Sequence, residues 1–122
     1  MIERMQVTDL AEKFGLFGEY WRPKIVGELN ESYVKVVKLK GEFVWHKHGN
    51  EDELFWVIQG TLVIRVRDRE LTVRPGQFLI IPKGVEHLPV AAEEVQVVLL
   101  EPKTTLNTGD VENERTIQAE WL

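Results

Sequence analysis

Cysteine is absent from this chain of 122 residues. Disulfide bonds, thiolate zinc sites and cysteine nucleophiles are therefore excluded. Long apolar runs are absent as well, since none approaches the roughly 20 residues that cross a bilayer. The opening residues, MIERMQVTD, lack the apolar segment of a signal peptide. We therefore expect a cytoplasmic protein that does not associate with a membrane.

Positive charge is in short supply. The 15 Lys and Arg residues are outnumbered by 20 Asp and Glu, which gives a net charge of −5, and no stretch is dense in Lys or Arg. This balance disfavours nucleic acid as a partner, because its phosphates attract basic surfaces.

The composition is that of a globular protein, with 43% hydrophobic and 29% charged residues. The length argues for one domain over residues 1–122. Within it we expect a short helical segment at about 8–22, a β-barrel at about 25–102 and a polar extension at about 103–122. The extension is too poor in apolar residues to form its own core. It is expected to lie across the barrel, cross to a partner subunit or remain partly disordered.

The middle of the chain predicts an all-β fold. Short runs rich in Val, Ile, Phe and Trp alternate with turn residues every 8–12 positions, which is typical of a sandwich or barrel. The expected strands are 25–29, 33–40, 42–48, 53–59, 61–67, 70–74, 77–81 and 94–101. Ahead of them, Asp9 and Glu12 resemble a capping box that begins a helix.

Histidine is sparse, and its three positions carry the strongest functional signal. His46 and His48 lie two apart in an apolar stretch, so a strand there points both imidazoles to the same face. Glu53 opens the next apolar run, and His87 lies in a later segment bounded by Pro and Gly. Three imidazoles and one carboxylate are the nitrogen and oxygen ligands that a transition metal needs.

Two other carboxylates compete with Glu53. Glu51 and Asp52 immediately precede it. Spacing and strand phase favour Glu53, and we expect the other two to belong to a solvated turn.

The opposite face of the histidine strand and its neighbour is strongly apolar. If the histidines point into a barrel, the large side chains that point outward are Phe43, Trp45, Leu54, Trp56 and Ile58. A patch of this kind is large for a monomer to expose. We expect residues 9–24 or a second subunit to cover it and predict a homodimer built on this face. The alternative is that two stacked sheets seal the patch within one chain.

The spacing of these residues resembles both sequence signatures of the cupin superfamily. The first signature, a glycine, H-x-H, three or four residues, Glu, six residues and Gly, corresponds to Gly41, His46-Lys47-His48, Glu53 and Gly60. The second, G-x5-P-x-G-x2-H-x3-N, corresponds to Gly76, Pro82-Lys83-Gly84, His87 and Ala91. Two details depart from the pattern: four residues rather than five separate Gly41 from His46, and Ala91 replaces the asparagine.

The resemblance implies a double-stranded β-helix, the jelly-roll barrel of cupins, that holds one divalent metal. The implied ligands are His46, His48, Glu53 and His87. Four protein ligands leave open positions on an octahedral ion, where small molecules bind. Imidazole and carboxylate suit Fe, Mn, Ni, Cu or Zn, and the sequence does not choose among them.

For function we expect a metal-dependent enzyme that acts on a small molecule, either dioxygenase-like or, as in mannose-6-phosphate isomerase-like cupins, isomerase-like. The alternatives are a cupin that binds or senses a small ligand without turnover and a structural protein with an idle site. With every histidine on the metal, an acid or base must be a carboxylate, Tyr, Lys or water on the metal. The candidate pocket residues are Tyr33, Lys35, Phe55, Val57, Gln59, Phe78 and Glu86. Their apolar members favour a compact, partly apolar substrate.

Overall fold

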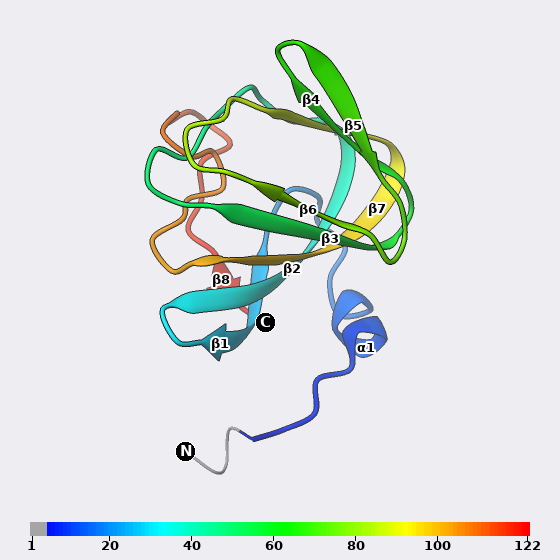
Figure 1. The fold of residues 1–122 in the computed structure, drawn as a ribbon. Coiled ribbons are helices and arrows are strands. Elements are labelled where there is room, and N and C mark those ends of the chain that lie inside the picture. Colours follow the sequence, from blue (N-terminus) through cyan, green and yellow to red (C-terminus); the bar gives the residue numbers. More distant parts are fainter. Residues whose placement is uncertain (1–4) are drawn as a thin grey trace.

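The computed structural model describes residues 5–122 and consists mainly of β-strands with one short helix (Figure 1). In chain order the elements are α1 (Leu10–Phe14), β1 (Lys24–Leu29), β2 (Ser32–Glu42), β3 (Glu53–Gln59), β4 (Leu62–Val66), β5 (Arg69–Val73), β6 (Phe78–Ile81), β7 (Leu88–Pro102) and β8 (Glu120–Trp121). The predicted all-β class is confirmed.

Two long antiparallel strands, β2 and β7, hold the barrel together. The sheet runs in the order β5-β4-β7-β2-β1-β8, while β3 pairs with both β7 and β6. The first part of β7 pairs with β4 and its later part pairs with β3. The register of β7 on β2 slips between Leu39 and Gly41, where Gly41 has a φ of 85°. Such an irregularity bends a strand pair, so β2 and β7 bend here and link the two halves of the barrel (Figure 1).

The predicted strand over 42–48 is wrong. β2 already ends at Glu42, and His46 alone forms an isolated bridge, with His87. That bridge has hydrogen bonds in both directions, His46 N–H to the His87 carbonyl at 3.1 Å and His87 N–H to the His46 carbonyl at 2.9 Å. The left-handed backbone at Gly41, just before the end of β2, breaks the strand alternation. β7 also begins at Leu88, earlier than the expected 94.

The helix is shorter than the predicted segment 8–22. The capping prediction is confirmed, because the Asp9 side chain accepts a hydrogen bond from the Glu12 N–H at 3.2 Å. The helix ends at Gly15, whose N–H bonds to carbonyls of the preceding turn. Among residues 5–122, α1 is the only helix, and its five residues are far too few to cross a bilayer.

The barrel interior holds the main hydrophobic core. Its buried residues come from β2 to β7 at alternating positions, such as Val37 and Leu39 on β2 or Val95, Val97 and Leu99 on β7. A second, smaller cluster lies outside the barrel, where Phe14 of α1 packs on Val36 and Val98. The helix therefore covers part of the outer sheet face.

Two of the five apolar side chains expected to point outward do not form part of that face. Phe43 is only 9% exposed and stacks on Trp21 with ring centroids 4.8 Å apart. Trp45 is half-buried and lies under the Arg67 guanidinium. Both follow the end of β2, where strand alternation no longer sets the direction of a side chain.

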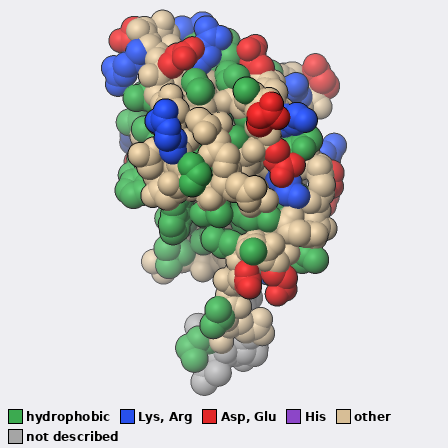
Figure 2. All heavy atoms as spheres, turned by 90° about the vertical axis from the view of Figure 1, so that its right-hand side faces the viewer, with side chains coloured by type: hydrophobic (Ala, Val, Ile, Leu, Met, Phe, Trp, Pro, Cys, Tyr) green, Lys and Arg blue, Asp and Glu red, His purple; other side chains and the backbone are tan. Residues whose placement is uncertain are grey.

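The remaining three residues behave as expected. Leu54 and Ile58 are half-buried and Trp56 is 43% exposed on the outer face of β3. Phe78 and Ile80 of β6, paired with Trp56 and Leu54, extend this face and are 61% and 51% exposed. Figure 2 shows hydrophobic side chains gathered in a band above the N-terminal segment.

Candidate metal centre

The fold brings together four side chains that are far apart in the sequence. His46 and His48 lie on the irregular segment between β2 and β3, Glu53 is the first residue of β3, and His87 immediately precedes β7. All four are buried, with at most 4% of their surface exposed. One nitrogen or oxygen of each lies within 4.8 Å of those of the others. Such a separation allows all four atoms to contact one ion.

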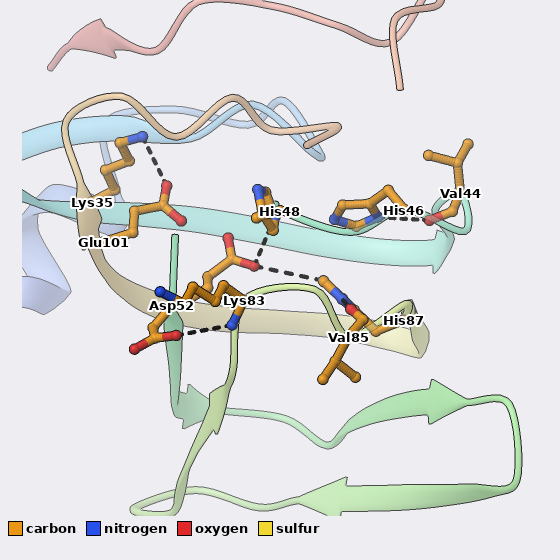
Figure 3. A network of polar contacts seen from close by, with 10 residues as sticks. Lys35, Val44, His46, His48, Asp52, Lys83, Val85, His87 and Glu101 are labelled. Atoms are coloured by element: carbon orange, nitrogen blue, oxygen red, sulfur yellow. Dashed lines mark hydrogen bonds and ion pairs between the residues drawn. The ribbon is translucent and has the colours of Figure 1, made fainter. Parts of the chain in front are cut away.

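Glu53 is at the centre of this cluster. Its Oε1 lies 3.2 Å from His48 Nε2 and 3.6 Å from His87 Nε2. In Figure 3 the two contacts are the dashed lines that run from His48 and from His87 to one oxygen of a carboxylate. The ring centroids of His46 and His48 are 5.1 Å apart, and those of His46 and His87 are 4.2 Å apart.

Backbone carbonyls orient two of the three imidazoles. His46 Nδ1 lies 2.8 Å from the Val44 carbonyl, and His87 Nδ1 lies 2.9 Å from the Val85 carbonyl (Figure 3). A carbonyl can only accept, so Nδ1 of each ring carries the proton and donates it. The Nε2 lone pair of each ring is then free to bind a metal ion.

Several atoms of the cluster lack a hydrogen-bond partner. His48 Nε2, His87 Nε2 and Glu53 Oε1 are all buried and unsatisfied. An unpaired buried polar group costs about 1–3 kcal/mol. A cation among these atoms would remove that cost, and neutral imidazole with carboxylate is a donor set that divalent transition metals accept. The residues present therefore fit a metal ion.

Burial and charge set the protonation of the histidines. Burial, assisted by the nearby His87, lowers the pKa of His46 to about 4, so this ring is neutral at pH 7. Burial also acts to lower the pKa of His48, but the nearby Glu53 carboxylate, 3.2 Å away, outweighs it and raises that pKa above its ordinary value. Because a metal ligand must be deprotonated, a proton on His48 competes with a metal ion for this site.

A second glutamate, Glu101 at the end of β7, lies next to Glu53 and was not predicted. Burial and the negative charge of Glu53 raise the pKa of Glu101 well above its usual range. Burial also acts to raise the pKa of Glu53, but its polar neighbours, first Glu101 and then His48 and His87, hold that pKa well below its usual range. Of the two carboxyls, Glu101 is therefore the one that is protonated more readily and Glu53 the one that keeps its charge more readily. Lys35 Nζ completes the group at 2.8 Å from Glu101 Oε1.

The sequence did carry a signal for Glu101. Val97, Leu99 and Glu101 lie at alternate positions of one strand, so a Glu that continues the inward-facing series must also point inward. Lys35, which was a candidate pocket residue, continues the inward series of Val37 and Leu39 on β2 in the same way.

A small cavity adjoins the cluster. His46, Glu53 and Glu101 form part of its wall, and apolar side chains such as Phe43, Phe55 and Leu99 form much of the rest. Its volume is about 40 Å³. A cavity needs roughly 10–15 Å³ of such volume to hold one water molecule, whereas pockets that bind organic ligands have volumes of about 300–1,000 Å³. The cavity therefore has room for a few waters or a diatomic molecule.

Of the candidate pocket residues, Phe55 lines this cavity and the others lie elsewhere. Val57 is fully buried in the core, Gln59 is exposed beyond a register slip in β3, and Phe78 is on the outer face. Tyr33 packs edge-on against Trp121 with centroids 5.9 Å apart. The candidate Glu86 pairs with Arg67 away from this cavity. Asp52 and Glu51, the two carboxylates that competed with Glu53, accept hydrogen bonds from the Lys83 N–H and the Thr104 hydroxyl.

The polar extension lies along the barrel, beside the segment between β2 and β3 that carries His46 and His48 (Figure 1). We refer to residues 104–117 as the C-terminal strap. Asn107 contributes to the cavity wall, and the Asp110 N–H donates to the Lys47 carbonyl at 2.9 Å. Gly109, with a φ of 60°, packs so closely on Lys47 and the His46 ring that a Cβ would overlap the Lys47 carbonyl. The strap therefore braces the segment that carries two candidate ligands.

Comparison with known proteins settles the family. Residues 33–103, more than half of the chain, match the Cupin_2 family, described as a cupin domain. The chain is a cupin. Its barrel resembles the crystal structure of a cupin-2 domain containing protein from Shewanella frigidimarina, with 46% identity, a TM-score of 0.78 and coverage of 79% of this cupin and 94% of that chain. It also resembles protein NMB1881 from Neisseria meningitidis, with 28% identity, a TM-score of 0.74 and coverage of 80% and 99%.

One curated relative is the uncharacterized protein YdbB of Bacillus subtilis, 40% identical over 63 residues. The match covers 51% of this cupin and 56% of YdbB, so it spans only about half of the relative's length. These relatives identify the fold and the family, and none of their descriptions names a reaction.

Proposed function

We propose that this cupin binds one divalent transition metal through His46, His48, Glu53 and His87 and acts as an enzyme on a small molecule. The observation that carries the proposal is the convergence of buried, unsatisfied nitrogen and oxygen atoms on one point. When bound, the metal would supply Lewis-acid or redox chemistry at the coordination positions that four protein ligands leave open.

The protein residues have separate tasks in this proposal. Val44 and Val85 hold two imidazoles in the tautomer that binds metal, and burial keeps His46 neutral. The apolar walls of Phe43, Phe55 and Leu99 restrict water. Glu101 places a second carboxyl, with a raised pKa, at the cavity wall.

Cavity size and lining bear on the type of reaction. A volume of about 40 Å³ admits water or dioxygen but no sugar phosphate unless the wall moves. We therefore favour a dioxygenase-like reaction over an isomerase-like one, with a compact and partly apolar organic substrate.

The second candidate is a cupin that binds or senses a small ligand without turnover. The small, mostly apolar cavity is compatible with this function. Glu101 favours the enzyme, because a binding module needs no acid or base beside its ligand.

Metal analysis of natively purified protein, followed by oxygen-uptake assays, tests the proposal. We expect about one transition metal ion per chain and oxygen uptake with a member of a panel of small organic acids, diketones and phenols. A His46→Gln/His48→Gln double variant serves as the control and should lose both the bound metal and the oxygen uptake. Metal content equal in the two proteins would refute the site, and metal without turnover of any substrate would favour the binding function.

We further propose a homodimer that covers the outer face of β3 and β6. Helix α1 packs over Val36 and Val98 but leaves Trp56, Phe78 and Ile80 substantially exposed. A contiguous apolar face of this kind is typical of an interaction site. A cytoplasmic location and the lack of a nucleic-acid partner stay predictions from the sequence.

A further inference from the structure

Two residues in the wall of the cavity beside the metal cluster reach the surface of the protein. Trp21 and Asn107 are half-buried, whereas every other residue that lines this cavity is buried. A molecule that enters from solvent without disturbing the buried wall must therefore pass these two side chains. We refer to Trp21 and Asn107 as the mouth of the cavity.

The mouth lies outside the part of the chain that matches the cupin family. That match covers residues 33–103 and includes all four candidate metal ligands. Trp21 precedes β1, and Asn107 lies on the C-terminal strap. The cupin barrel therefore supplies the metal cluster, and the two segments that flank it close the cavity.

Trp21 is held from several directions. Its N–H donates to the Lys38 carbonyl and its indole Nε1 donates to the Lys40 carbonyl, both at 2.8 Å. Its ring stacks on Phe43 with an interplanar angle of 16°, and Phe43 in turn meets the His46 ring edge-on, with centroids 5.5 Å apart. One aromatic ring therefore separates the indole from a candidate metal ligand.

The backbone of Trp21 is strained. Its φ of 64° lies in the left-handed region, and among residues 5–122 the one other non-glycine residue with a positive φ is Asn30. Asparagine tolerates this conformation, but for a bulky side chain it is unfavourable. Strained residues cluster at functional sites, where the surrounding structure keeps them in place. The strain therefore agrees with a role for the indole beyond packing.

Asn107 forms the other side of the mouth, and its side chain is fixed as well. Its Nδ2 donates to the Arg115 carbonyl at 2.7 Å, and its Oδ1 accepts from the Ile117 N–H at 2.9 Å. The Arg115 guanidinium donates to the Glu42 carbonyl at 3.1 Å, and its central carbon lies 5.4 Å from the centre of the Phe43 ring. The strap is therefore tied to the aromatic ring on which the indole stacks.

We propose that Trp21 is a specificity-determining residue, which together with Asn107 limits the molecules that reach the metal to those with a few non-hydrogen atoms. The proposal rests on the proposed metal site and assigns the size limit of the 40 Å³ cavity to one side chain that can be removed. A side chain in the path of entry discriminates by steric clash, which excludes a larger ligand while a smaller one still binds.

Ligand binding to the Co(II)-loaded protein tests the proposal, because the visible spectrum of bound Co(II) changes when an added ligand coordinates it. Azide is the small probe, and imidazole, a planar ring, is the larger one. We expect azide to change the spectrum of both the wild type and Trp21→Gly. Imidazole should bind Trp21→Gly at least about tenfold more tightly than the wild type. Glycine is chosen because it accepts the left-handed backbone.

Equal imidazole affinity in the two proteins, or no imidazole binding to either, would overturn the proposal. Phe14→Leu is the matched control for a general loosening of the fold, since Phe14 is buried in the small cluster outside the barrel. This variant should resemble the wild type with both probes. If it also gained imidazole binding, loosening rather than the mouth would admit the ring, and the proposal would be overturned.

A second variant decides if Trp21→Gly does not fold. Trp21→Phe keeps a ring that can stack on Phe43 but is smaller than the indole. Imidazole binding should still improve, by a smaller factor, and unchanged binding would overturn the proposal. A wild-type protein that takes up no Co(II) would instead refute the metal site itself. That result differs from a failure of the mouth, in which Co(II) binds but imidazole does not distinguish the variants.

Discussion

At the scale of single residues, His46 and His87 share one local arrangement. Each ring donates from Nδ1 to the carbonyl two positions earlier, at 2.8 Å and 2.9 Å. The backbones of the same two residues pair with each other. A single bridge of two hydrogen bonds therefore fixes the positions of two candidate ligands, although 41 positions separate them along the chain.

The buried His46 gives a pH-dependent stability. Its pKa is about 4 in the folded protein and 6.5 for a solvent-exposed histidine, so between these values the unfolded chain binds more protons. Stability without metal should therefore fall as the pH drops from about 6.5 toward 4, by up to about 3 kcal/mol. Urea unfolding of the chelator-treated protein at several pH values measures this change in the free energy of unfolding. The unfolding free energy of the His46→Gln variant should change less with pH over this interval. The same pH dependence in the variant and the wild type would contradict the assignment to His46.

The spacing of H-x-H and the following Glu indicated a metal site, and the resemblance to the two cupin signatures added His87 to it, because the distant His87 meets the other three residues only when a barrel closes. Strand alternation was less reliable. It placed Leu54, Trp56 and Ile58 correctly but put Phe43 outside, because β2 ends before Phe43 and the next residues follow no strand. Strand alternation could also have predicted that Glu101 points inward, since it continues the buried series of Val97 and Leu99.

At the scale of elements, the C-terminal strap was beyond sequence reasoning. Its few apolar residues show neither a helical nor a strand period. The sequence therefore allows the strap to lie across the barrel, to cross to a partner subunit or to be partly disordered. In the structure, hydrogen bonds and close packing hold the strap in place. The Asp110 N–H donates to the Lys47 carbonyl, and Thr108 is fully buried, with its hydroxyl 2.6 Å from that of Thr116. Contacts of this kind depend on the folded surface that they meet.

Gly109→Ala tests the bracing by the strap. The new methyl group would overlap the Lys47 carbonyl and push the strap from the histidine segment. Gly76→Ala is the matched control, because Gly76 also has a positive φ, 83°, but nothing within 4 Å of a Cβ. Both variants should lose about 1–2 kcal/mol of stability from the left-handed backbone. Only Gly109→Ala should weaken Co(II) binding, by about tenfold; equal affinities would show that the strap does not support the site.

At the scale of the whole molecule, the outer face of β3 and β6 predicts the oligomeric state. We expect light scattering to give a dimer for the wild type and a monomer for Trp56→Lys/Phe78→Lys, because paired charges on the two strands would be buried without partners. Leu29→Lys, at an exposed position at the end of β1, should remain dimeric. A monomeric mass for the wild type would rule out the dimer.

Metal removal should destabilise the whole barrel, since the cluster joins β3 to the segments before β3 and β7. A ligand present at about 100 times its Kd adds about 2.7 kcal/mol, which for a chain of this size corresponds to roughly 10 °C in Tm. Calorimetry before and after chelation, and after metal is restored, measures the difference. The His46→Gln/His48→Gln variant should show no response to chelator, and an unresponsive wild type would contradict the site.

The tightness of the cavity has a consequence for the identity of the ion. A space of about 40 Å³, walled in part by Asn107, leaves room for only a few waters beside a bound ion. Cavity size and donor set choose no single metal among Fe, Mn, Ni, Cu and Zn. The metal found in a preparation would therefore depend on which ions were available to the protein.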